Sequence, residues 1–194
     1  DPKKDENNHY RLLFDIFENP MSGITKRYKR LRLNPKYGNK EKNMLISQGC
    51  IQPKKIITGK GWITLFELTQ KGKSILRDSG FEIKHTREGV VHKFFKQKIA
   101  DYYKSKNFEV LVEEPINGRP DIIVLTDGKK IAVEIETGKS DAIGNIQNRL
   151  KSGFNEIISI ATNKIVEEKI RQELKRKKII DKRVKVTSVR AFGA

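Results

Sequence analysis

The stretch GRPDIIVLTDGKKIAVEIETGKSD, residues 118–141, contains two apolar runs joined by a short polar turn. The runs are DIIVL and KKIAVEI, and the turn contains Asp127-Gly128, a pair typical of tight hairpin turns. Three acids break the apolar pattern: Asp121 opens the first run, and Glu134 and Glu136 alternate at the end of the second. Counting back from the turn sets Asp121 opposite a residue near position 134. The sequence therefore predicts a β-hairpin with acids gathered at its open end.

Because strand side chains alternate between faces, Glu134 and Glu136 are expected to point the same way. Carboxylates that share a site repel one another and need cations, and Mg²⁺ or Mn²⁺ with oxygen ligands would meet that need. The alternative is that the glutamates are exposed strand ends paired with Lys129, Lys130 or Lys139. Because the two strands are otherwise apolar, we favour the metal site over this alternative.

The chain has 194 residues and a formal net charge of +17. A strongly basic protein most often binds a polyanion, so DNA is the expected partner, although a solvated lysine-rich surface is the alternative. The single cysteine, Cys50, excludes an internal disulfide and a Cys-rich zinc site, and it fits a reducing cytoplasmic location. No apolar run is long enough to span a membrane. The chain starts without methionine, which we read as a sign of processing or of a larger polypeptide.

The first part of the chain predicts three helices, two strands and a closing helix, in that order. The helices are HYRLLFDIFENP, SGITKRYKRLRL and NPKYGNKEKNMLISQG, the strands CIQPKKII and WITLFEL, and the last helix LTQKGKSIL. Asn34 and Thr69 are the expected N-caps of the third and last helices. Gly38 disfavours helix by about 1 kcal/mol relative to Ala, so the third helix is expected to start nearer Asn39.

This order and the phrase FELTQKGKSIL resemble a winged helix-turn-helix domain, which would occupy residues 1–84. The resemblance implies that the third helix enters the major groove and that the hairpin tip and Trp62 contact phosphate. The DNA-binding residues expected are Lys36, Tyr37, Asn39, Lys40, Lys42, Lys54, Lys55 and Lys60. Winged helices also act as protein–protein adaptors, and lysines on a helix are often only solvated. A transcriptional regulator is a third reading, but it leaves the acids unexplained.

The second part, residues 85–194, predicts the order α-β-β-β-α-β-α-β. The helix EGVVHKFFKQKIADYYKSKN precedes the strand FEVLVEEP and the hairpin, and a helix capped by Ser140 or Asp141 follows. The strand EIISIAT, a basic helix at about 164–177 and the strand RVKVTSV complete the chain. We expect an α/β domain with a mixed sheet.

The motif GRPDIIV…IAVEIE resembles the PD-(D/E)-x-K nuclease superfamily, which includes restriction endonucleases and Holliday-junction resolvases. The resemblance implies that Asp121, Glu134 and the Ile135 carbonyl bind Mg²⁺ or Mn²⁺. Glu136 stands where the family usually has its lysine, and Lys139 is the nearby residue that could take that role. Secondary candidates are His92, Glu113 or Glu114, Gln147 and Arg149, with the backbone N–H groups at Ser140-Asp141 as a phosphate contact.

Two functions remain open from the sequence. The first is a metal-dependent DNA endonuclease with Asp121, Glu134, Glu136 and Lys139 as catalytic residues, expected to be a homodimer if it cuts both strands. The second is a nuclease-like module without cleavage activity that binds DNA for a larger machine, such as a mobile element, a defence system or a translocating ATPase.

Overall fold

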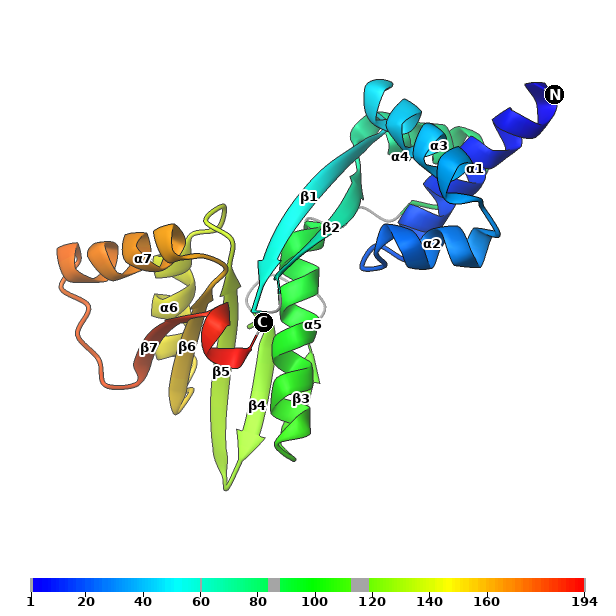
Figure 1. The fold of residues 1–194 in the computed structure, drawn as a ribbon. Helices are drawn as coiled ribbons and strands as arrows, with labels where there is room; N and C mark the ends of the chain where they lie inside the picture. The colour runs from blue at the N-terminus through cyan, green and yellow to red at the C-terminus, as the bar shows by residue number, and fades with distance from the viewer. Residues whose placement is uncertain (1, 60, 84–87, 113–118, 194) are drawn as a thin grey trace. The chain divides into compact units, whose positions relative to one another are not determined.

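The computed structural model describes residues 2–59, 61–83, 88–112 and 119–193. The chain forms two compact units (Figure 1). The N-terminal unit contains residues 1–57 and 61–90, and the C-terminal unit contains residues 58–60 and 91–194. The main boundary thus falls between Val90 and Val91, slightly beyond the boundary expected after residue 84.

The N-terminal unit has the expected order of three helices, a hairpin and a final helix. Its elements are α1 (Pro2–Glu18), α2 (Ile24–Leu31), α3 (Pro35–Ser47), β1 (Ile51–Thr58), β2 (Gly61–Leu68) and α4 (Gln70–Asp78). The core joins α1 to the other elements through Leu12, Leu13, Leu45, Phe66 and Leu76, all buried. Thr69 caps α4 by accepting a hydrogen bond from the N–H of Gly72.

The start of α3 differs from the expectation. The side chain of Asn34 caps the helix by accepting a hydrogen bond from the backbone N–H of Lys36. The helix therefore begins at Pro35 rather than near Asn39. Gly38 is buried, and a Cβ there would lie 2.6 Å from Cε1 of Tyr28. The glycine therefore lets α3 approach the Tyr28 ring of α2, and this packing outweighs its low helix propensity.

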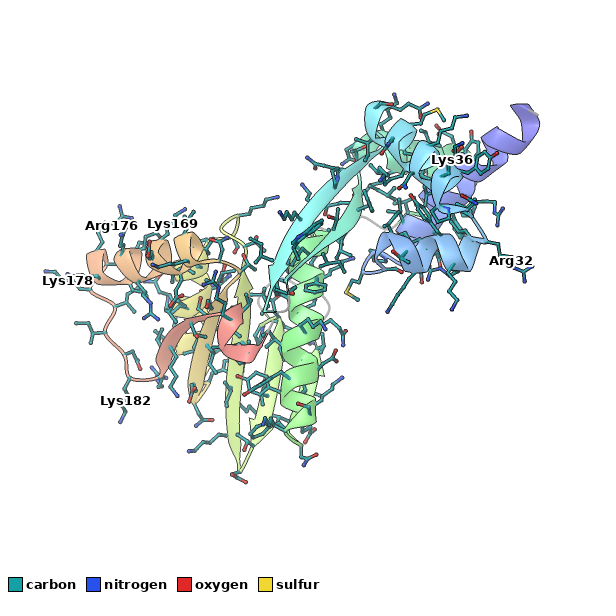
Figure 2. The ribbon with its side chains drawn as sticks, in the orientation of Figure 1. Arg32, Lys36, Lys169, Arg176, Lys178 and Lys182 are labelled. Atoms are coloured by element: carbon teal, nitrogen blue, oxygen red, sulfur yellow. The ribbon has the colours of Figure 1, made fainter. Side chains whose placement is uncertain are left out.

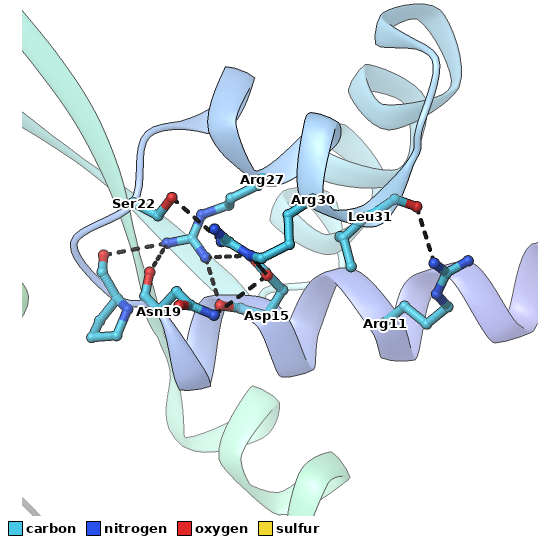
Figure 3. A network of polar contacts seen from close by, with 8 residues as sticks. Arg11, Asp15, Asn19, Ser22, Arg27, Arg30 and Leu31 are labelled. Carbon is cyan, nitrogen blue, oxygen red and sulfur yellow. Dashed lines mark hydrogen bonds and ion pairs between the residues drawn. The ribbon is translucent and has the colours of Figure 1, made fainter.

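A buried network ties α1 to α2 (Figure 3). The carboxylate of Asp15 accepts hydrogen bonds from Arg27, at 2.8 Å, and from Arg30, at 2.5 and 2.8 Å. Arg27 also donates to the carbonyls of Asp15 and Asn19. Burial raises the pKa of Asp15, but the hydrogen bonds from Arg30 and Arg27 outweigh it and leave the pKa below its usual value. Arg27 is therefore a structural residue and not a surface contact.

The C-terminal unit is mixed α/β. Its elements are α5 (Val90–Ser105), β3 (Glu109–Val112), β4 (Ile122–Thr126), β5 (Lys129–Glu136), α6 (Ala142–Lys151), β6 (Glu156–Ala161), α7 (Lys164–Arg176), β7 (Val184–Ser188) and the 3₁₀ turn η1 (Val189–Phe192). The sheet order is β3-β4-β5-β6-β7. The pairs β3–β4 and β4–β5 are antiparallel, whereas β5–β6 and β6–β7 are parallel. A mixed sheet was the expected architecture.

The hairpin has the expected register. Thr126 pairs with Lys129 and Ile122 with Val133, so the turn is Asp127-Gly128. Both turn residues have positive φ, 42° and 73°, as a type I′ turn requires. Asp121, one residue before β4, is thereby brought level with Glu134.

One face of the sheet packs against α6 and α7. Ala132 of β5 and Ile157 of β6 belong to the same buried cluster as Ile143 and Ile146 of α6 and Ile170 of α7. Glu134 and Glu136 follow Ala132 at alternate positions of β5, so they point to the face that α6 covers. In the part of the chain that the structure describes, no helix has the length and apolar character to cross a bilayer.

Candidate active site

Asp121 links three elements at the open end of the hairpin. Its Oδ2 accepts a hydrogen bond from the backbone N–H of Ile135 at 2.8 Å, so the side chain continues the ladder beyond the end of β4. The same oxygen lies 3.0 Å from Nε2 of His92, in the first turn of α5. Both side chains are about 20% exposed, so solvent reaches this pair. His92, a secondary candidate in the sequence, therefore joins the acids.

Glu134 is buried against a cation. Its side chain is 4% exposed, and its Oε1 accepts a hydrogen bond from Nε of Arg149 at 2.5 Å. The pKa of Glu134 is raised to about 7: burial is the largest cause, the nearby charge of Asp121 adds to the rise, and Arg149 opposes both. The two acids are thus close enough to influence each other's ionisation.

Glu136 is held by neutral donors. It is 1% exposed and accepts hydrogen bonds from the Ser140 hydroxyl and from the Asn145 amide, the latter at 3.3 Å. Burial raises its pKa, the two hydrogen bonds oppose the rise, and Asp121 adds to it. Both glutamates are therefore internal, and the alternative of exposed strand ends paired with Lys129, Lys130 or Lys139 is wrong.

The donor set fits a hard divalent ion at two of the acids. Among the described residues, the hydrogen bonds to Asp121 all fall on Oδ2 and the one to Glu134 falls on Oε1. Each acid keeps one oxygen without such a bond, whereas both oxygens of Glu136 are engaged. Ser159 pairs with Glu134 across β5 and β6, and its fully buried hydroxyl has no hydrogen-bond partner within the described ranges. Oxygen ligands of this kind suit Mg²⁺ or Mn²⁺.

The other candidates of this unit lie at different distances from the acids. Ile135 contacts Asp121 through its N–H. Lys139 is exposed and lines a pocket of about 340 Å³ together with Glu136. Gln147 is exposed on α6, whereas Arg149 is buried on Glu134 and so reaches the acids rather than solvent. Glu113 and Glu114 lie outside the described residues.

Helix α6 contributes Asn145, which the sequence did not predict as a partner of the acids, besides the secondary candidate Arg149. Asp141, and not Ser140, is the N-cap, since it accepts a hydrogen bond from Gly144 N. Asn145 and Arg149 are four residues apart, so both lie on the face that meets Glu136 and Glu134. This spacing is visible in DAIGNIQNRL, but only the packing of α6 on β5 shows which acids it serves.

Helix α3 exposes part of the expected DNA-binding set. Lys36, Tyr37 and Lys40 are exposed. The side-chain oxygen of Asn39 accepts hydrogen bonds from the Tyr28 hydroxyl, at 3.1 Å, and from the Lys42 ammonium, at 3.0 Å. Asn39 therefore also holds α3 to α2.

The hairpin lysines need a correction. Lys54 and Lys55 lie within β1 and not at its tip. Lys54 is 3.8 Å from Glu67, and the Lys55 ammonium lies 4.8 Å from the centre of the Trp62 ring. Lys60 lies outside the described residues. Trp62 is 66% exposed and lines an open groove of about 850 Å³ with Lys42 among the other residues.

Comparison of the chain with protein-family models, with curated proteins and with solved structures gives no match.

Proposed function

We propose that the chain is a DNA-binding protein whose C-terminal unit is a metal-dependent endonuclease. The observation that carries this proposal is the gathering of Asp121, Glu134 and Glu136 at the open end of the β4–β5 hairpin. Two of them are buried glutamates, and the pKa of Glu134 is raised to about 7. Burying such a group costs free energy, and ionisable groups with perturbed pKa values gather at functional sites.

In this proposal Asp121, Glu134 and the Ile135 carbonyl hold Mg²⁺ or Mn²⁺. The bound ion would stabilise negative charge at a phosphate and lower the pKa of a water molecule. His92 would orient Asp121 through their 3.0 Å contact. Lys139, exposed beside Glu136, is the residue proposed to stabilise the scissile phosphate.

The exposed lysines of α3 supply the proposed contact with duplex DNA. Lys36 and Lys40 carry the charge, and lysines favour phosphate over base contacts. The order of elements in this unit supports a winged helix-turn-helix. Two-strand cleavage would need two active sites, so we propose a homodimer for that reaction.

A second function is favoured by the contacts of the glutamates. Arg149 already supplies a cation to Glu134, and both oxygens of Glu136 are occupied. A module that binds DNA for a larger machine without cutting it would need no more than this. The two functions differ in whether divalent ions produce cleavage.

The experiment is a plasmid nicking assay with Mg²⁺ or Mn²⁺, paired with DNA-binding measurements in EDTA. The wild type is compared with Asp121→Asn, Glu134→Gln and the control Asp101→Asn, which changes an exposed acid of α5. Nicking that the first two variants lose and the control keeps supports the endonuclease. Absent nicking with salt-sensitive DNA binding supports the module, and absent binding refutes both.

A further inference from the structure

Six basic side chains lie along α7 and the loop that joins it to β7. Figure 2 labels four of them, Lys169 and Arg176 on α7 and Lys178 and Lys182 on the loop. All six are exposed: Lys169, Lys175, Arg176, Lys177, Lys178 and Lys182. This set is called the α7 basic surface below.

Four basic residues around this surface form ion pairs, whereas the described residues include no ion-pair partner for the six members of the surface. Four neighbours form ion pairs: Lys164 with Glu168, Arg171 with Glu167, Arg183 with Asp181, and Lys185 with Glu156. For the six residues of the surface no ion pair exists within the described ranges. Two acids lie near the surface: Glu173 lines a pocket together with Lys169, and Lys182 helps Arg183 to lower the pKa of Asp181. Six basic residues still exceed these two acids, and a polyanion would balance the excess positive charge.

Lys178 occupies a backbone position that favours glycine. Its φ is 54°, and the N–H groups of Lys178 and Ile179 bond to the carbonyls of Lys175 and Leu174, which closes the end of α7. Glycine is the usual residue at such a helix end because a side chain disfavours positive φ. The lysine at this position adds a charge to the surface, although the helix dipole also favours a cation at the end of a helix.

We infer that the α7 basic surface binds the phosphate backbone of duplex DNA, as a second contact besides α3. Lysines predominate and no exposed aromatic residue accompanies them, which suits phosphate contact without base reading. Only the choice of DNA as the polyanion rests on the proposed function. The inference needs neither the carboxylates of the candidate active site nor a metal ion. Ile180, 95% exposed within the loop, raises an anionic membrane as the competing partner to test.

The experiment measures binding of the full chain to a duplex of arbitrary sequence, in EDTA and over a range of salt concentrations. The test variant carries Lys175→Gln, Arg176→Gln, Lys177→Gln and Lys182→Gln. The matched control carries Lys104→Gln, Lys106→Gln, Lys129→Gln and Lys130→Gln, which removes the same charge from exposed positions elsewhere in the unit. Both variants therefore have the same net charge.

Each phosphate contact contributes about 0.9 to the slope of log affinity against log salt. The test variant is expected to lower that slope by about 3 to 4 and the control by less than about 1. Equal effects of the two variants would mean that only net charge matters, and an unchanged slope would mean that the surface does not touch DNA. Either result overturns the inference. Binding of the same proteins to phosphatidylserine vesicles tests the membrane alternative, and a test variant that loses vesicle binding but keeps DNA binding also overturns the inference.

Lys178→Gly separates binding from folding. The substitution removes a charge but relieves the positive φ, so the thermal stability is expected to stay the same or rise while DNA affinity falls. An unchanged affinity would assign Lys178 to the helix end alone and contradict its place in the surface. Because no metal is present, failure of this inference is distinct from failure of the endonuclease proposal, which is read from cleavage.

Discussion

Replacing Arg149 by methionine would leave Glu134 buried without its cation. Both side chains are about 5% exposed, and the guanidinium donates directly to the carboxylate. Removing one member of a buried pair typically costs about 3 to 5 kcal/mol, because the remaining charge is left uncompensated. We therefore expect Arg149→Met to lower the free energy of unfolding of the C-terminal unit by about 3 kcal/mol at high pH.

The loss should depend on pH in a defined direction. Burial raises the pKa of Glu134 from 4.5 to about 7, so the folded protein holds a proton that the unfolded chain has released in this range. The corresponding stability is fully present below about pH 4.5 and is lost as the pH rises to about 7, a change of about 3 kcal/mol. Arg149 attracts only the ionised carboxylate. The deficit of the variant should therefore be small near pH 5 and grow as the pH rises through 7.

Urea unfolding in EDTA, followed by far-UV circular dichroism, measures this deficit. Trp62, the single tryptophan, lies in the N-terminal unit, so its fluorescence provides an internal control that should not change. The double variant Arg149→Met/Glu134→Met should recover most of the stability, because it removes both charges. A deficit of equal size at about pH 5 and pH 8.5, or below about 0.5 kcal/mol at both, would refute the buried pair.

Two further predictions concern the N-terminal unit, where Trp62 fluorescence is the probe. Gly38→Ala should cost about 1 to 3 kcal/mol by overpacking, because the new Cβ would lie 2.6 Å from the Tyr28 ring. The same change in a Tyr28→Ala background should be nearly neutral, and equal costs in both backgrounds would rule out this clash. The pKa of Asp15 is lowered in the folded protein, so its contribution to stability should be fully present above about pH 3.8. This contribution should fade as the pH falls through the pKa of Asp15 in the folded protein. Asp15→Asn should abolish that acid dependence and cost about 3 kcal/mol at neutral pH, whereas an unaltered acid transition would contradict it.

The hairpin could be read from sequence because its determinants are local. Asp127-Gly128 fixes a two-residue turn, the turn fixes the register, and the register brings Asp121 level with Glu134. Helix order and the mixed sheet likewise follow from apolar periodicity and caps. In contrast, the start of α3 depends on a tertiary contact, since Gly38 is favoured by the Tyr28 ring and not by its neighbours in sequence.

The partners of the acids could not be predicted in the same way. Arg149 follows Glu134 by 15 positions in the chain, and their pairing depends on how α6 packs on β5. The lysines of β1 were expected at the hairpin tip because strand ends are poorly defined by composition. Which residues bind a metal depends on free oxygens, and these are known only once Ser140 and Asn145 are seen to engage Glu136.

The central claim is that Asp121 and Glu134 form a divalent-ion site. Anomalous scattering from crystals of the protein soaked in Mn²⁺ tests it directly. We predict a manganese peak within coordination distance of both carboxylates, and no such peak in crystals of Asp121→Asn. A structure in which Arg149 still binds Glu134 and no manganese lies between the two acids would contradict the account.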